Sequence, residues 1–271
     1  MRHPRGTLLG LALSTAMTAA FAETGDIPIN PALRDKFYFG LGAFFPRTTT
    51  EVQLDSNRLG AGANITAEDS LGWDNRKTVP NAFGRWRFGE RWRLEAEWFE
   101  LNRDGTRTIN RDIVFGDQVF PVNAAVSSSF DFSDLRVGVG YSFFKRTDKE
   151  LGVGFGLHVA SYDISLAASG LAGQQDDVLA PLPVISFYGL FALTDKWAVG
   201  GRLDRFSLNY DKFEGSLSSM SLDLTYQPWR NFGFGIGYRS LFIRMSAEQD
   251  ARTLRFKQTF EGPLLYVTAS F

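Results

Sequence analysis

The most constraining feature of this sequence is an alternation of large apolar residues with glycine or charged residues. In the segment 135–143, Leu, Val, Val, Tyr and Phe occupy every second position, with Arg136, Gly138 and Gly140 between them. A period of two residues is the signature of a β-strand, whose successive side chains point to opposite faces. The same pattern recurs at 151–159, 220–226 and 232–238, so it predicts a fold made of strands.

The distribution of bulk between the two strand faces separates two all-β classes. A soluble sandwich packs the large side chains of both sheets into a shared core. Here one face carries Phe, Trp, Tyr and Leu, while the other carries mostly Gly, Ser, Thr and charge. A small barrel in lipid needs that arrangement, because its outside is apolar and its interior has room mainly for small residues and paired charges. The pattern predicts an all-β fold, an antiparallel up-and-down transmembrane β-barrel.

Composition limits the alternatives further. The 25 Phe, 8 Tyr and 6 Trp stand beside 27 Gly, and the mean hydropathy is only −0.14. No stretch beyond the N-terminal segment reaches the ~18 consecutive apolar residues of a membrane helix, whereas barrel strands need only every second residue to be apolar. The chain has no Cys and a formal net charge of −1, so thiolate metal sites and a nucleic-acid partner are not expected. We predict no cofactor and no metal.

The N-terminal segment has the form of an export signal. Two arginines precede a short, mostly apolar core, and residues 20–22 have the small-x-small pattern of a cleavage site. Residues 1–22 are therefore predicted to be a cleaved signal peptide. We interpret residues 23–36 as a periplasmic lead-in, with a small plug inside the lumen as the alternative, and residues 37–271 as the barrel.

Turn signals divide the barrel region into ten strands, although eight or twelve remain open. The expected membrane portions are 37–46, 79–88, 91–101, 130–144, 150–164, 181–193, 196–208, 217–228, 231–245 and 255–271. Short turns, three of four with a basic residue beside Trp, alternate with longer polar connections, as periplasmic turns and outer loops do. Apolar phase shifts near Asp134, Ala160 and Glu261 indicate bulges or exits from the membrane.

The longer connections differ in what they predict. The longest, 47–78, is expected to be an outer loop, as are 169–180 and shorter segments near 210–215 and 247–253. In 103–126 the residues that flank Gly116-Asp117 alternate, so the third and fourth strands are expected to continue above the membrane as a hairpin.

The last residues of the chain carry a family resemblance. Residues 265–271 alternate and end in Phe271, with Val267 and Ala269 on the same face, which resembles the closing strand of Gram-negative outer-membrane proteins. The stretch 65–73 is similar to a group of uncharacterised small barrels and adds no activity. The resemblance implies an outer-membrane location, a terminal signal read by the barrel assembly machinery, and lipid and lipopolysaccharide as partners.

Strand parity also predicts which charged side chains enter the lumen. They are Arg85, Arg87, Arg93, Glu95, Glu97, Arg136, His158, Arg202, Asp204, Asp223 and Arg239. Six Arg against four carboxylates in a narrow barrel are expected to form ion-pair networks, since an isolated buried charge is very costly. The network predicts either an occluded structural barrel or a narrow pore in which the excess positive charge favours anions.

Two other classes of function stay open. The resemblance includes lipid-modifying enzymes and a protease family, and His158 is the one histidine of the predicted mature chain, with Ser161 and Asp163 on the same strand. However, a His and a Ser three apart on a strand point to opposite faces unless a bulge intervenes. The other class is binding or adhesion through the long 47–78 loop. We expect no enzyme, and a passive envelope component as the function.

Overall fold

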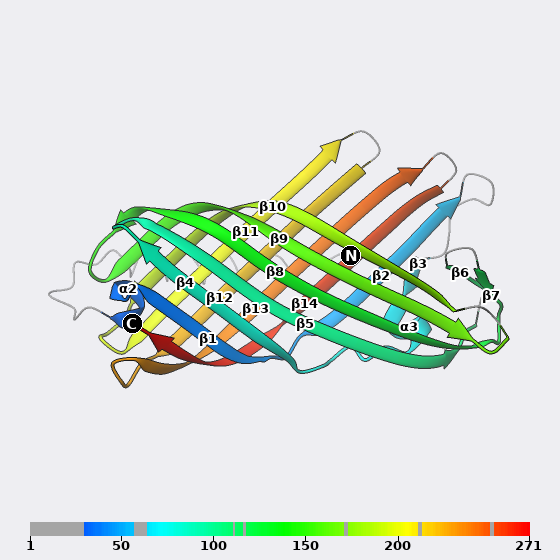
Figure 1. Cartoon of the computed structure of the whole chain (residues 1–271), viewed down its shortest axis with the longest axis horizontal. Helices are drawn as coiled ribbons and strands as arrows, with labels where there is room; N and C mark the ends of the chain where they lie inside the picture. The colour runs from blue at the N-terminus through cyan, green and yellow to red at the C-terminus, as the bar shows by residue number, and fades with distance from the viewer. Residues whose placement is uncertain are drawn as a thin grey trace, which may run out of the picture.

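The computed structural model describes residues 30–56, 64–110, 112–115, 118–170, 173–210, 213–249 and 252–271. Ten long antiparallel strands form a closed barrel (Figure 1), so the predicted fold and strand number are confirmed. The elements are α2 (Pro31–Arg34), β1 (Phe37–Phe44), β2 (Arg47–Ser56), β3 (Asn64–Thr66), α3 (Ala67–Leu71), β4 (Val79–Phe88), β5 (Trp92–Thr108), β6 (Ile113–Phe115), β7 (Gln118–Phe120), β8 (Ala125–Lys145), β9 (Lys149–Ala168), β10 (Gln174–Ala192), β11 (Trp197–Tyr210), β12 (Phe213–Tyr226), β13 (Phe232–Gln249) and β14 (Arg252–Ser270). The predicted signal peptide lies outside the described residues.

The ring closes between the first and the last strand. Around it the order is β1-β4-β5-β8-β9-β10-β11-β12-β13-β14, and β1 pairs back onto β14 from Tyr38↔Ser270 to Phe44↔Leu264. β2 continues along the same β14 strand, from Arg47↔Glu261 to Ser56↔Arg252. β1 and β2 are therefore successive parts of one strand of the wall.

Exposed apolar side chains form a belt around one part of the barrel. The belt includes Phe39, Leu41, Val137, Phe155, Ile185, Leu203, Leu222, Ile236 and Val267. Trp92, Trp197 and Trp229 are exposed at the short-turn end, where amphipathic indole rings mark a membrane boundary. The belt and this ring of tryptophans place the barrel across a bilayer, with the short turns at one face.

None of the helices in the described part of the chain is long and apolar enough to span a bilayer.

The predicted phase shifts near Asp134 and Ala160 are exits from the membrane. At Asp134 and Ala160 β8 and β9 pair without interruption, and the register shift in this pair lies instead between Tyr141 and Phe144. Beyond Leu135, which is exposed in the belt, the outward position Asp131 is polar and the inward Phe132 is buried. Where water replaces lipid outside, the apolar face must turn inward, so the pattern inverts while the strand continues.

The outer connections are shorter than predicted because the strands continue above the belt. β10 begins at Gln174, so most of 169–180 is strand, and β11 with β12, and β13 with β14, extend through the segments expected to be loops at 210–215 and 247–253. The segment 47–78, expected to be one loop, contains β2, β3 and α3. The predicted hairpin is confirmed: β5 and β8 pair up to Thr108↔Ala125, and β6 pairs with β7 beyond them.

Above the belt the wall separates into two sheets. β10 and β11 pair only between Ile185↔Arg205 and Ala192↔Ala198, although both strands run further. On the other side of the barrel β4 begins only at Val79 and does not reach this level. There α3 lies between β2 and β5 and packs against both. The strands β5, β8 and β9 accordingly diverge from β11 to β14 at the right-hand end of Figure 1.

Candidate functional site

The barrel interior is the candidate site, because the predicted charged residues meet there. All eleven lie on inward positions, and each is buried or half-buried: Arg85 and Arg87 on β4, Arg93, Glu95 and Glu97 on β5, Arg136 on β8, His158 on β9, Arg202 and Asp204 on β11, Asp223 on β12, and Arg239 on β13. The even spacing along each strand puts them on one face. The interior is layered along the barrel axis. Charged groups lie between an apolar layer at the short-turn end and an aromatic layer above the belt.

Ion pairs cross the middle of the lumen. Glu97 accepts hydrogen bonds from Arg202 at 2.5 Å and from Arg239 at 2.7 Å. On the ring, three strands separate β5 from β11 and from β13 along the shorter path, so these contacts join opposite walls. Arg239 also donates to Asp223 at 2.9 Å. Such pairs satisfy charges that would be costly if left alone in the lumen.

A second cluster lies beside this bridge and contains the one histidine in the described residues. Its Nδ1 is 2.9 Å from Asp134 and its Nε2 is 3.5 Å from Asp204, so His158 lies between two carboxylates. Asp204 also accepts hydrogen bonds from Arg136 at 2.7 Å and from Ser186 at 2.5 Å. His158 is only 2% exposed, which places the imidazole inside the network rather than at a mouth of the barrel.

The enzyme-like arrangement considered from the sequence is not assembled around this histidine. His158 points inward, whereas Ser161 and Asp163 follow at odd spacing on an uninterrupted strand and face outward. No bulge lies between them, because β8 and β9 remain in register through Ala160.

A third cluster lies toward the short-turn end. The Glu150 carboxylate is fully buried, accepts a hydrogen bond from Ser142, and pairs with Arg87 at 2.6 Å. Arg93 pairs with Glu95 at 3.0 Å. The guanidinium of Arg93 also stacks over the Tyr188 ring, 3.0 Å from its centroid.

Two lumen carboxylates were missed from the sequence, and they change the charge balance. Asp134 and Glu150 join Glu95, Glu97, Asp204 and Asp223, so six carboxylates face the six predicted arginines in the charged layers of the lumen. The predicted excess of two positive charges was therefore wrong. Parity could have found both residues, because Asp134 is two positions from Arg136 and Glu150 is two from Gly152. Asp134 was overlooked because it lies at a phase shift of the apolar pattern, and Glu150 because it lies at a turn.

Glycines of the lower lumen make room for inward aromatic rings. A Cβ at Gly152 would lie 2.1 Å from Cζ of Tyr188, and one at Gly235 would lie 2.0 Å from Cζ of Tyr266. The glycine face predicted from the sequence is real, but much of its space is filled by these rings. Glycine is needed here because any side chain would collide with the ring opposite it.

An aromatic layer fills the lumen above the charged groups. The Phe132 and Phe260 ring centroids are 4.6 Å apart, those of Phe99 and Phe260 5.5 Å, and those of Tyr162 and Phe256 5.2 Å. Four strands separate β9 from β14 in either direction around the ring, so rings from opposite walls touch. The bulky face points outward in the belt, as predicted, and inward at this level, where water lies outside.

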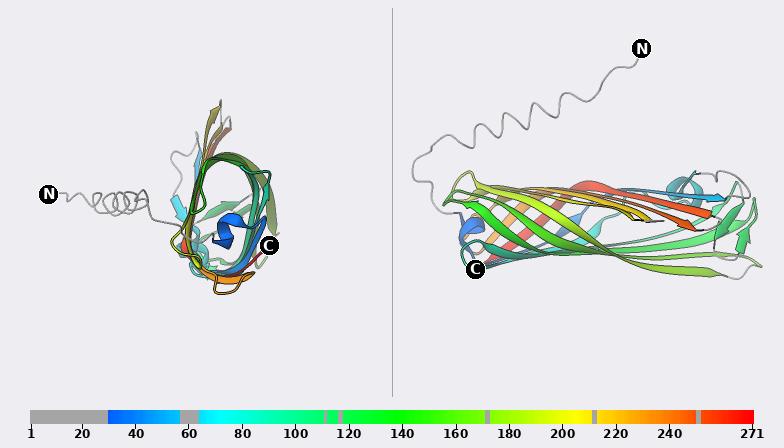
Figure 2. Two further views of the ribbon diagram at one scale, coloured as in Figure 1. Left: turned by 90° about the vertical axis from the view of Figure 1, so that its left-hand side faces the viewer. Right: turned by 90° about the horizontal axis from the view of Figure 1, so that it is seen from above.

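The short helix α2 lies within the mouth at the short-turn end, inside the ring of strands in the left view of Figure 2. Asn30 donates to the carbonyl oxygens of Thr194 at 3.1 Å and Asp195 at 3.2 Å, and Arg85 donates to the carbonyl oxygen of Ala32. Ala32 and Leu33 are buried. Residues 30–34 thus fill the mouth, as in the plug alternative; residues 23–29 of the segment lie outside the described part.

At the opposite end α3 bridges the gap in the wall. Glu68 pairs with Arg103 at 2.6 Å, and Arg103 donates to the Thr50 hydroxyl at 2.8 Å, which ties α3 to β5 and β2. Trp73 donates to Ser128 at 2.9 Å from the inner side of the same region. Much of the predicted 47–78 loop is therefore part of the wall and its seal.

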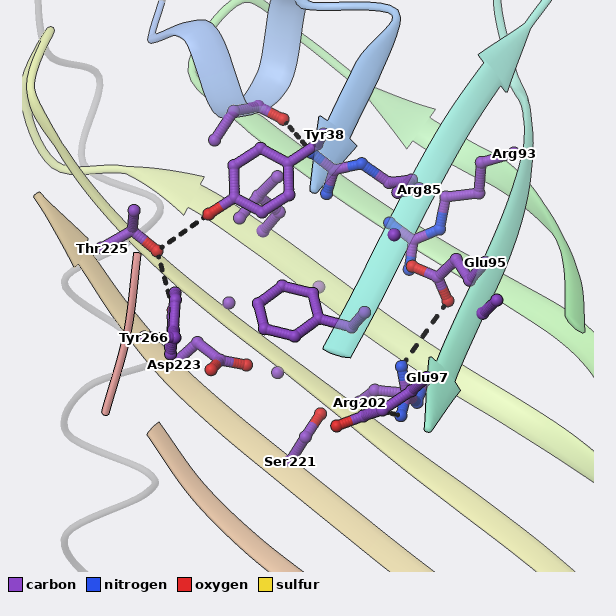
Figure 3. Close-up of a pocket in the computed structure, with 18 of the residues that line it drawn as sticks. Tyr38, Arg85, Arg93, Glu95, Glu97, Arg202, Ser221, Asp223, Thr225 and Tyr266 are labelled. Carbon is purple, nitrogen blue, oxygen red and sulfur yellow. Dashed lines mark hydrogen bonds and ion pairs between the residues drawn. The ribbon is translucent and has the colours of Figure 1, made fainter. Parts of the chain in front are cut away.

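Two small cavities lie in the charged region of the described chain. One has a volume of about 90 Å³ and lies between α2 and the central ion pairs (Figure 3). The other, of about 30 Å³, lies on the side of His158 and Phe99. Glu97, Arg202 and Arg239 line both, so the central ion pairs separate them. Within the described chain no group of three or more His, Cys, Asp or Glu residues is arranged to hold a metal ion.

The predicted assembly-signal residues lie at the barrel seam. Val267 is exposed in the apolar belt, and Phe271 is exposed just beyond β14. The backbone of Phe271 exchanges hydrogen bonds with Phe37 at 2.9 Å, which closes the ring at its short-turn end. Ala269, at the position between them on the same face, is half-buried.

Neither a protein-family model nor a curated protein sequence matches the chain. Among solved structures, the outer membrane protease OmpT from Escherichia coli is similar with a TM-score of 0.57 at 9% identity, over 92% of this chain and 99% of OmpT. The outer membrane protein OprG from Pseudomonas aeruginosa has a TM-score of 0.41 at 10% identity, over 91% of this chain and 99% of OprG. The P. putida toluene transporter TodX has a TM-score of 0.34 at 9% identity, over 90% and 93%. The likeness to OmpT establishes a shared fold, and it assigns no activity.

Proposed function

Since the chain is a transmembrane barrel with the fold of Gram-negative outer-membrane proteins, we propose that it is a structural component of the outer membrane whose lumen is closed to solutes. The observation that carries this proposal is the contact of opposite walls at two levels. Glu97 joins Arg202 and Arg239 across the charged layer, and Phe132 meets Phe260 across the aromatic layer. Because α2 fills one mouth as well, a solute would have to displace three layers in series.

The charge of the lumen argues against an anion-selective pore. Six arginines and six carboxylates face each other in the charged layers of the lumen, and the further buried Arg103 is paired with Glu68, so the fixed charge that would select anions is balanced. The cavities of about 90 and 30 Å³ have room for several waters, and ion pairs divide one cavity from the other.

The test is the conductance of the purified barrel in planar bilayers, with an open porin in the same bilayers as the positive control. We expect no conductance steps at any holding voltage. Arg202→Ala should also stay silent because the aromatic layer remains, and Phe132→Ala should stay silent because the ion pairs remain. Regular conductance steps from the unmodified barrel would overturn the proposal.

An enzyme acting through His158 is the alternative, and the geometry favours a structural role for this residue. Its Nδ1 is 2.9 Å from Asp134, and its buried Nε2, 3.5 Å from Asp204, has no hydrogen-bond partner in the described part of the chain, so no hydroxyl nucleophile there is hydrogen-bonded to this ring. Mass spectrometry of lipid A from cells with and without the protein should give identical acyl patterns, and a model peptide should remain uncut. A change in either would favour catalysis.

We further propose that outer-membrane lipid and lipopolysaccharide surround the belt and that the barrel assembly machinery inserts the chain through the strand ending at Phe271. The exposed Val267 and Phe271 beside the seam support this. Replacing Phe271 with Ala should lower the amount of folded barrel in outer-membrane fractions, while refolding of the purified variant in detergent should be unchanged.

A further inference from the structure

Arg85 differs from the other inward arginines in its partners. Arg87, Arg93, Arg136, Arg202 and Arg239 each have a carboxylate within 4.0 Å. Within the described chain no ion pair is formed by Arg85, whose guanidinium donates to the carbonyl oxygen of Ala32 and lies 4.9 Å from the centroid of the Tyr38 ring. A carbonyl dipole and a ring face offset only part of a full positive charge.

The charge around Arg85 is locally unbalanced even though the whole lumen is balanced. Arg85, Arg87 and Arg93 lie in the layer next to α2, where Glu95 and Glu150 supply two carboxylates. The buried Asp35 at the end of α2 is paired with Arg34 at 3.0 Å and adds no net charge. This layer therefore carries one excess positive charge. An unpaired cation away from bulk water is expensive, so this region favours a negative ion.

The same region contains space for such an ion. The cavity of about 90 Å³ is lined by Arg85 and Arg93 and by the hydroxyl-bearing Tyr38, Ser221 and Thr225. It exceeds several-fold the roughly 10–15 Å³ that one water needs. The Nε atoms of Arg85 and Arg93 are buried and have no hydrogen-bond partner in the structure. Figure 3 shows Tyr38 and Arg85 side by side at this cavity, under α2.

We propose that this cavity binds a small monovalent anion of halide size, held chiefly by Arg85. Guanidinium groups are donors only, and hydroxyl groups can turn their hydrogens toward an anion. Glu95, Glu97 and Asp223 line the other side of the cavity, and their charge limits the site to one negative charge. Since α2 covers the cavity from the mouth, the ion is enclosed during folding or enters when α2 moves.

A bromide experiment tests the site directly. The unmodified barrel is refolded and crystallised in sodium bromide, and anomalous scattering locates the ion without any substitution. We expect a bromide peak inside the cavity, in contact with Arg85. Absence of a peak in the cavity from otherwise well-diffracting crystals would overturn the proposal, while leaving the closed-barrel function untouched.

Thermal unfolding in detergent gives an independent measurement. At equal ionic strength, replacing gluconate, which is too large for the cavity, with chloride should raise the unfolding midpoint by roughly 2–4 °C, because an ion that binds only the folded state stabilises it. Arg85→Met should lose this difference. The control Arg205→Met removes an exposed, outward cation on β11 and should keep it. Equal midpoints of the unmodified barrel in the two salts would contradict the proposal.

Discussion

Glu150 is the residue on which the lower ion pairs depend. It is fully buried, and its carboxylate receives Arg87 at 2.6 Å, the Ser142 hydroxyl, and Arg93 at 3.8 Å. A carboxylate in this position compensates two guanidinium groups that have no bulk water. Its worth to the fold therefore lies in the charges it neutralises, more than in any one contact.

Glu150→Gln should destabilise the barrel strongly. The amide keeps the shape of the side chain but removes the charge, which leaves Arg87 uncompensated, and breaking a buried pair in this way costs about 3–5 kcal/mol. The measurement is denaturant unfolding of the detergent-solubilised barrel. Glu90→Gln, at an exposed turn of the same end, is the control and should change stability by less than about 0.5 kcal/mol. An equal effect of the two substitutions would contradict the assigned role.

The inward position of most charged lumen residues was predictable from the sequence, but their partners were not. Parity placed Arg136 and His158 inside, since each lies within a long alternating run. It could not identify their partners, because an ion pair such as Arg136 with Asp204 depends on which strands face each other across the ring. Asp134 was read only as a disturbance of the apolar pattern, although it binds His158.

A row of acidic residues crosses the outer face of the neighbouring strands β8, β9 and β10 above the belt. Asp131 on β8 faces Asp163 on β9, which in turn faces Asp177 on β10, in directly paired positions. Like charges in such positions repel each other. Partial burial, followed by the charge of Asp163, raises the pKa of the Asp131 carboxyl.

Asp163→Asn should therefore stabilise the barrel at neutral pH, by about 0.2–1 kcal/mol. A raised pKa means that the folded state holds the Asp131 proton more firmly than the unfolded chain. The folding stability that this proton provides is complete below the unfolded pKa of about 3.9, and is lost as the pH rises through the folded pKa.

The gain from Asp163→Asn should accordingly be present at pH 7 and vanish in acid, where the carboxylates are protonated. Thermal midpoints across this pH range, in matched salt, provide the measurement. The control Glu90→Gln removes a carboxylate at the other end of the barrel and should show no such gain. A gain that persists unchanged in acid would show that repulsion is not its cause.

Strand number was predictable and strand length was not. Short turns with Trp at the membrane boundary mark strand pairs in the sequence, so ten strands could be counted. The predicted ends followed the apolar face, which for β10 stops near residue 181, whereas the strand starts at Gln174. Above the belt the outer face of the wall meets water instead of lipid. The apolar residues of each strand therefore point inward there and the polar residues outward. β2 was predicted to be part of a loop for the same reason, since its outward residues Arg47, Thr49 and Glu51 are polar.

The interior of the barrel is layered because the medium outside its wall changes from lipid to water along the barrel axis. Where lipid lies outside, the apolar surface is already provided by the belt, and the lumen can hold charges that pair across it. Where water lies outside, the same wall must bury its apolar residues inside, and the rings around Phe132 form the core. One change of the external medium thus produces both an ionic layer and an aromatic layer in a single barrel.

The short turns at one end predict how the barrel is oriented in the outer membrane, and labelling the two ends of β9 tests this orientation. Asp148 directly precedes β9 at the short-turn end beside α2, and Ser169 directly follows it at the far end beyond the belt. Since the chain has no Cys, Ser169→Cys and Asp148→Cys each provide a single thiol. A polymer-linked maleimide should label Ser169→Cys in intact cells and Asp148→Cys only after the outer membrane is permeabilised, because short turns face the periplasm. Labelling of Asp148→Cys in intact cells, with Ser169→Cys protected, would reverse the orientation.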